Sequence, residues 1–246
     1  MRAVTVLAAV VAGVVMASGG GGNALADVVY STGFEPPAYT AGGLLSGQDG
    51  WFNNGGGVVE TTTVFSGVQA VGYTAEGVFG QPVDYHAVPT SGQGSVMRAS
   101  VEFFFSAADP QVAWEVLAAD DGSIFLAQIV VFNGTLLLWD SSSIVGRARV
   151  TAGVWHNYEL VFDFATDIVT GYLDGGSLGT GSLDPAATSL TDVGFGINDA
   201  LGAGTSQAFA DDLSVEAVPE PSSLALVGAS LVGLGAIRRR KGVRLS

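Results

Sequence analysis

The chain has no cysteine, and nearly all of its basic residues lie at its two ends. Without cysteine no disulfide can stabilise the fold, so core burial, a bound metal or both must do so. Between residues 27 and 217 the sequence has three arginines and 22 of its 23 acidic residues, a formal charge of −19. A field of this sign repels phosphate groups and favours divalent cations, which excludes nucleic-acid binding.

The usual signatures of zinc and serine-hydrolase sites are also absent. His86 and His156 are the only histidines, and no His-Glu-x-x-His or paired-cysteine spacing offers a zinc site. Residues 175–179 match Gly-x-Ser-x-Gly, but no helical pattern follows them, as a nucleophile elbow would require. We therefore expect a hairpin turn there, and a packing role for His156 at a strand end.

No stretch between residues 27 and 217 shows a sustained helical period. Short runs of alternating or continuously apolar residues are instead separated by Gly, Asn and Asp, which predicts an all-β domain. Asn133-Gly134 between two apolar runs predicts a tight hairpin, because both central residues of a type I′ turn need positive φ. The predicted strands in this part are 96–105, 112–118, 124–132 and 135–139.

The first 26 residues have the layout of a secretory signal peptide. Arg2 precedes an apolar run over residues 3–17, and Ala24-Leu25-Ala26 forms a small-residue cleavage site. Cleavage there leaves a globular domain over residues 27–217.

Residues 218–246 form a three-part tail. The motif 218–221, with Pro219, Glu220 and Pro221, precedes an apolar helix over 222–237 and a basic end over 238–246. This arrangement resembles the PEP-CTERM sorting signal of exopolysaccharide-producing Gram-negative bacteria. The resemblance implies an exosortase-type protease as partner, a transient stay in the inner membrane, and release to the cell surface or extracellular matrix. An ordinary C-terminal membrane anchor is the alternative, and the positive-inside rule puts the domain outside in both cases.

A second resemblance covers the domain itself. The pair Trp155-His156 opens one apolar run, and Tyr172-x-Asp174-Gly175 closes the next, as in concanavalin A-like and laminin G-like domains. The resemblance implies a jelly-roll sandwich of two antiparallel sheets, with the first strand near residues 33–35 beside the last near 208–215. By alternation, one face of the run over 155–163 is core, with Tyr158, Leu160 and Phe162.

Two candidate binding sites follow. The loop over residues 48–57 combines aromatic rings with amides that can stack on a sugar and bind its hydroxyls, namely Trp51, Phe52, Asn53 and Asn54. In the alternative, Trp51 plugs one end of the sandwich. If the terminal strands are adjacent, Glu35, Asp211 and Asp212 meet and offer the oxygen ligands that Ca²⁺ prefers.

Catalysis is not expected. Glycoside hydrolases of the concanavalin A-like superfamily use a Glu-x-Asp-x-x-Glu strand, and this spacing does not occur here. We therefore expect a non-catalytic, exopolysaccharide-associated protein that binds glycans. The alternatives are a glycan-cleaving enzyme with displaced acids and a purely structural matrix component.

Overall fold

The computed structural model describes residues 26–53, 55–75, 80–120, 124–199 and 204–219. The predicted signal peptide and the tail from Glu220 onward, including Pro221, lie outside these ranges. The described residues form fifteen strands, and none of them is in a helix. No helix among them is long and apolar enough to span a membrane.

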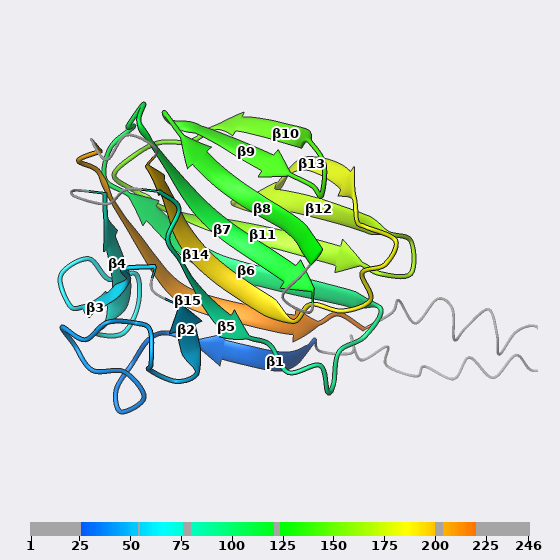
Figure 1. Ribbon diagram of the computed structural model, residues 1–246, viewed down its shortest axis with the longest axis horizontal. Coiled ribbons are helices and arrows are strands. Elements are labelled where there is room, and N and C mark those ends of the chain that lie inside the picture. Colours follow the sequence, from blue (N-terminus) through cyan, green and yellow to red (C-terminus); the bar gives the residue numbers. More distant parts are fainter. Residues whose placement is uncertain (1–25, 54, 76–79, 121–123, 200–203, 220–246) are drawn as a thin grey trace, which may run out of the picture.

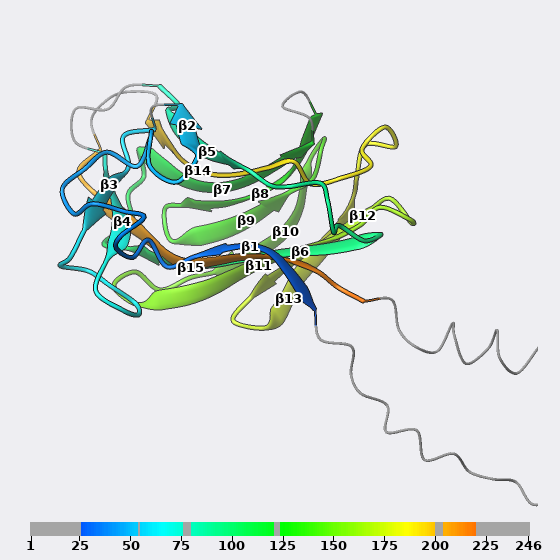
Figure 2. The same cartoon turned by 90° about the horizontal axis from the view of Figure 1, so that it is seen from below.

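The strands make two antiparallel sheets that face each other as two layers (Figures 1 and 2). One sheet runs in the order β13 (Gly176–Ser182), β12 (Ile168–Leu173), β11 (Trp155–Asp163), β6 (Val96–Phe105), β15 (Gln207–Ala217), β4 (Ala70–Thr74) and β3 (Val58–Glu60), with β1 (Asp27–Thr32) also paired to β15. The other runs β10 (Ile144–Arg149), β9 (Thr135–Trp139), β8 (Ile124–Phe132), β7 (Val112–Asp120), β14 (Asp192–Asp199), β5 (Val83–Ala87) and β2 (Trp51–Asn53). The predicted all-β, two-sheet sandwich is confirmed.

The core lies between the sheets and is built by the period-2 alternation of their strands. On β11, Tyr158, Leu160 and Phe162 are all buried, as predicted. Val101 and Met97, which pair with Tyr158 and Phe162 on β6, are buried as well. Every strand and the whole described core fall between Asp27 and Ala217, so this segment holds all the interactions that the fold needs.

The first and last strands lie side by side, as predicted. Residues 27–32 of β1 pair with residues 213–217 of β15. The first strand ends before Gly33, however, so the prediction that residues 33–35 belong to it was wrong. Phe34 has a positive φ of 58°, which is incompatible with an extended strand and turns the chain away from the sheet edge.

The two predicted hairpin turns are present. Asn133 and Gly134 both have positive φ and join β8 to β9. Asp174 and Gly175 do the same between β12 and β13, so the Gly-x-Ser-x-Gly match lies in a hairpin. Ser177 is a strand residue and not a nucleophile elbow.

The free edges of the two sheets meet at β10 and β13. A Cβ on Gly146 would lie 2.6 Å from the carbonyl oxygen of Leu178, and a Cβ on Gly179 would lie 2.6 Å from that of Val145. The backbones therefore touch, and this side of the sandwich is closed.

Replacing Gly134 by Val tests the hairpin. A β-branched residue at its φ of 65° costs about 1–2 kcal/mol, so the unfolding free energy of the domain should fall by that amount. Urea denaturation measures it. Gly94→Ala is the control, because Gly94 has open space for a Cβ and should change stability by less than about 0.5 kcal/mol. Equal stabilities of G134V and wild type would contradict the turn assignment.

Candidate functional site

The outer face of the seven-stranded sheet carries a row of residues in register from one edge to the other. Across β2, β5, β14, β7, β8 and β9, each residue pairs with the next on the neighbouring strand. Alternation puts their sequence neighbours, such as Trp51 and Phe195, in the core. The row consists of Phe52, Tyr85, Gly194, Leu117, Gln128 and Trp139.

A pocket of about 200 Å³ lies at the β2 end of this row. We call it the aromatic pocket; it is lined by Phe52, Asn53, Tyr85, Ala119 and Asp192. The rings of Phe52 and Tyr85 are stacked, with centroids 5.9 Å apart and planes 26° apart. Phe52 is 43% exposed, so the pocket presents an aromatic surface to solvent beside an amide and a carboxylate.

Gly194 positions the tyrosine ring. A Cβ on Gly194 would lie 2.8 Å from Cδ1 of Tyr85 and 2.7 Å from the carbonyl oxygen of Asp84. Any larger residue would therefore displace the ring, which lies directly over the β14 backbone. The glycine therefore gives the Tyr85 side of the pocket its position close to β14.

Two carboxylates flank Tyr85 on the same face. Glu115 is buried and accepts a hydrogen bond of 2.7 Å from the Gln81 amide, and its burial raises the pKa of its carboxyl group. Burial also raises the pKa of Tyr85, and the charges of Glu115 and Asp192 raise it further. The phenol therefore stays protonated at neutral pH and can donate a hydrogen bond.

The sequence candidates for sugar binding divide between the two faces of β2. Phe52 and Asn53 line the aromatic pocket. Trp51 is 2% exposed and donates its indole N–H to the Tyr39 hydroxyl, so its prediction as a sugar-stacking residue was wrong and the plug alternative holds. Alternation explains the split between Trp51 and Phe52, because neighbours on a strand point to opposite faces. Asn53 has a positive φ of 72°, which ends the extended strand, so the alternation does not continue to it. Asn54 lies outside the described residues.

The remaining residues of the aromatic pocket had no signal in the sequence. Tyr85, Ala119 and Asp192 lie on three strands that are distant along the chain. Only the register of β5, β14 and β7 brings them to one face.

The calcium candidates do come together, at a bulge of β15. A Cβ on Gly33 would lie within 4 Å of side-chain atoms of Glu35, Asp211 and Asp212. Asp212 has a φ of 46°, and the register with β6 shifts between Asp211 and Ser214.

Backbone N–H groups of the β3–β4 loop bind these carboxylates. Asp211 is fully buried and accepts hydrogen bonds from the amides of Phe65 and Ser66, both at 3.0 Å. Glu35 accepts them from the amides of Val68 and Gln69. Within the described ranges, no group of three or more acidic or histidine side chains is arranged to hold a metal ion. Calcium binding here stays a prediction, and the loop amides offer another means of holding these charges.

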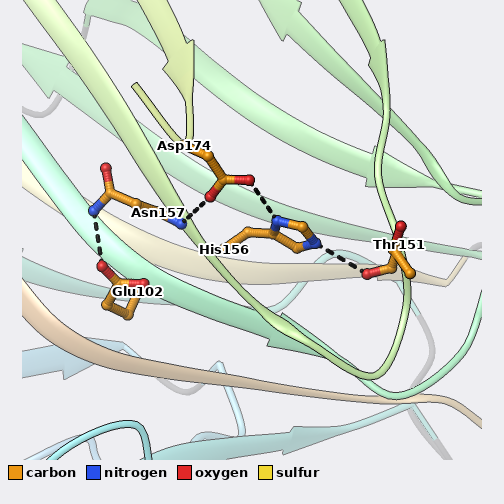
Figure 3. Close-up of polar contacts among 5 residues, drawn as sticks. All are labelled: Glu102, Thr151, His156, Asn157 and Asp174. Carbon is orange, nitrogen blue, oxygen red and sulfur yellow. Dashed lines mark hydrogen bonds and ion pairs between the residues drawn. The ribbon is translucent and has the colours of Figure 1, made fainter. Parts of the chain in front are cut away.

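A second polar network ties β6, β11 and the β12–β13 turn together (Figure 3). His156 contacts the Asp174 carboxylate through Nδ1 at 2.8 Å and the Thr151 carbonyl through Nε2 at 3.1 Å. Asp174 also accepts the backbone N–H of Asn157, whose side-chain amide donates to Glu102 at 3.0 Å. His156 thus has the predicted packing role at a strand end, where it holds the β12–β13 turn through its contact with Asp174.

This network lacks the nucleophile of a catalytic triad. Triad chemistry needs a hydroxyl or thiol at the imidazole nitrogen that does not face the carboxylate. Here that nitrogen, Nε2, faces a backbone carbonyl oxygen. Both ring nitrogens are used to join segments of the chain.

Comparisons with known proteins identify the tail. Residues 217–241 match the model of the PEP-CTERM protein-sorting motif, which confirms that prediction. The motif implies export and processing by an exosortase. No curated protein sequence matches the chain.

Comparisons with solved structures identify the fold of the domain. A carbohydrate esterase of Shiga toxin-encoding bacteriophage phi24B is 18% identical, with 79% of this chain and 100% of that chain covered and a TM-score of 0.55. The Emp47p carbohydrate recognition domain is 10% identical, with 79% and 97% covered and a TM-score of 0.53. A sialidase is 13% identical with a TM-score of 0.55, and the match covers 68% of this chain but only 17% of the sialidase. At these identities the likenesses show the β-sandwich fold alone.

The buried acid Asp211 should contribute more stability at mildly acidic than at neutral pH. Burial raises the pKa of Asp211 to about 6, against its ordinary value of 3.8. Between pH ~4 and ~6 the native state therefore holds a proton that the unfolded state has lost, and the contribution of Asp211 to stability falls as pH rises through this window, by on the order of 2 kcal/mol. Asp84, Glu102 and Glu115, whose pKa values burial also raises, act in the same direction. His86, whose pKa burial lowers, acts in the opposite direction, as do Asp109 and Asp140, whose pKa values hydrogen bonds lower despite desolvation.

Thermal melts of the 27–217 domain at pH 5 and pH 7.5 check this expectation. The Tm at pH 5 minus the Tm at pH 7.5 should be several degrees larger in wild type than in Asp211→Asn, because the variant lacks the proton that Asp211 keeps in the native state. Repeating the melts in 1 M NaCl is the control, because salt screens repulsion among surface charges but not the desolvation of a buried carboxyl. The same pH dependence of Tm in wild type and Asp211→Asn would contradict the expectation.

Proposed function

We propose that the protein is a non-catalytic, exported component of the cell surface or extracellular matrix that binds a glycan in the aromatic pocket. Its sandwich would be of the concanavalin A-like or laminin G-like type, and extracellular polysaccharide its partner. The observation that carries the proposal is the stacked Phe52 and Tyr85 pair, open to solvent beside Asn53 and Asp192.

The chemistry of the pocket suits a sugar. Aromatic rings pack against the C–H faces of a pyranose, and a few placed polar groups fix its orientation through the hydroxyls. Asn53 offers both a donor and an acceptor, Asp192 an acceptor, and the protonated Tyr85 hydroxyl a donor.

The positions of the acids favour binding over cleavage. Glu115 pairs with Gly196, which lies four residues from Asp192 on β14. At ~3.3 Å per residue the two positions are about 13 Å apart along the strand. Paired glycosidase carboxyl groups are ~5–9.5 Å apart. Gln81 also binds Glu115, which ties up one of its oxygens.

Loss of both rings should abolish binding. We expect Phe52→Ala with Tyr85→Ala to weaken the Kd of the 27–217 domain for its glycan by about tenfold or more, since buried aromatic anchors carry much of a binding energy. A glycan array identifies the ligand, and titration calorimetry measures the Kd. Phe65→Ala, which removes a 47% exposed ring from the β3–β4 loop, away from the aromatic pocket, is the matched control. If wild type binds no glycan on the array, the purely structural alternative is favoured.

The domain should release no sugar. Incubation with a broad panel of polysaccharides should give no reducing ends above buffer, because Asp192, the other acid beside Tyr85, lies too far from Glu115 for the two to act as a catalytic pair. The alternative, an enzyme with displaced acids, requires release that Glu115→Gln or Asp192→Asn abolishes. Such a result would overturn the non-catalytic assignment and leave the binding pocket in place.

A further inference from the structure

The three arginines of the domain are used in two different ways. Arg98 lies on β6 and makes ion pairs with Glu159 at 3.5 Å and Glu216 at 3.7 Å. Arg147 and Arg149 are exposed, and neither forms an ion pair among the described residues. Ion pairing within the domain therefore does not explain why it has these two arginines among 22 acidic residues.

Both of these arginines lie on the same face as the aromatic pocket. Arg147 pairs with Leu137 of β9, which pairs with Val130 of β8, which pairs with Glu115 of β7. Residues in register share a face, so Arg147 lies on the outer face with Glu115. Arg149, two residues further along β10, lies on that face too, ~6–7 Å away.

Protection of a sheet edge does not account for the pair. Charged residues on an edge strand commonly prevent pairing with other chains. The free edge of β10 is already covered, because its backbone at Val145 and Gly146 touches β13 at Leu178 and Gly179. We therefore look for the role of the arginine side chains on the outer face of the sheet and not at its edge.

The row described above connects the two ends of this face. It begins at Phe52 and Tyr85 and reaches Trp139, a half-buried ring on β9 next to the strand that carries the arginines. Six strand spacings of ~4.8 Å separate β2 from β10, about 29 Å. A ligand that touches both ends must be a chain of several sugars.

We propose that Arg147 and Arg149 form the far end of the glycan site and bind an anionic group of the polysaccharide, so that the ligand is an acidic polysaccharide. The inference rests on the proposed function. A guanidinium presents parallel N–H donors that match a carboxylate or sulfate with two hydrogen bonds. Trp139 packs against a sugar near the charged group, and the uncharged faces of other sugars stack on Phe52 and Tyr85.

The overall charge of the domain determines how salt should affect the binding of an acidic chain. A domain of −19 repels an acidic chain at long range, so attraction must come from a local contact. Salt screens this long-range repulsion as well as the contacts through exposed arginines. The part of the preference that the arginines carry, measured as the difference between wild type and Arg147→Gln with Arg149→Gln, should therefore shrink as salt rises.

Two matched pairs of polymers test the proposal. The first is polygalacturonate with its fully methyl-esterified form, which tests carboxylate; the second is dextran sulfate with dextran, which tests sulfate. Binding of the 27–217 domain is measured by biolayer interferometry at 50 mM and 300 mM NaCl. Wild type should bind the anionic member of at least one pair about tenfold more tightly at low salt, and the difference between wild type and Arg147→Gln with Arg149→Gln should be smaller at high salt.

Three variants separate the possible results. Arg147→Gln with Arg149→Gln should remove the preference and leave binding to the neutral member unchanged, whereas Phe52→Ala with Tyr85→Ala should weaken both members. Arg98→Gln is the control and should keep the preference. If wild type prefers the neutral member, or the R147Q/R149Q variant keeps the preference, the inference is overturned and the proposed function stands. If no polymer binds, both are overturned.

Discussion

The buried Asp211 carboxylate is the contact around which the long last strand is organised. It lies at the bulge where β15 changes partners, from β4 over residues 207–210 to β1 over 213–217, while β6 runs along the other side. The extra residue at Asp212 makes that exchange possible, and its positive φ turns the strand. The Asp211 oxygens accept N–H groups from the β3–β4 loop, so one carboxylate joins the bulge to a segment far away in sequence. The chain has no disulfides, so hydrogen bonds such as these hold the bulge and the β3–β4 loop together.

In the seven-stranded sheet the register of β7 with β8 shifts between Ala118 and Ala119, at the edge of the aromatic pocket, and the strands are regular on the Leu117 side of this shift. Its central strands stay in register from β2 to β9, so side chains on distant strands lie in straight rows. The inner rows fill the core with rings such as Phe195 and Trp51. The exposed positions of the outer rows, such as Phe52, Arg147 and Arg149, are free to vary, because their side chains do not determine packing. A binding surface can therefore be placed there without loss of stability, which is consistent with a fold shared by proteins of different functions.

Much of the fold could be predicted because it depends on local patterns. Alternation located the strands and the core face of β11, and the Asn133-Gly134 turn follows from the need for positive φ. The candidate site depends on register, which local patterns do not contain. Phe52 could be predicted as a binding residue because its loop combines aromatic rings with amides. Trp51 was wrongly predicted beside it, because a three-residue strand is too short to show which residues face the core. Tyr85 and the two arginines could not be predicted as site residues from the sequence, because only the pairing of strands in the sheet puts β5 and β10 on one surface.

The charge of the domain and the exposure of its arginines together indicate which arginines act in binding. A domain of −19 with three arginines gains from every ion pair it can form, and Arg98 forms two. Solvent-exposed pairs contribute little to stability, about 0–1 kcal/mol, so keeping Arg147 and Arg149 unpaired costs the fold almost nothing. The same two groups contribute more when a ligand carboxylate replaces water on a bidentate guanidinium. Their position on the face of the aromatic pocket, at the opposite end of one continuous sheet, is therefore better explained by recognition of a long anionic chain than by stability.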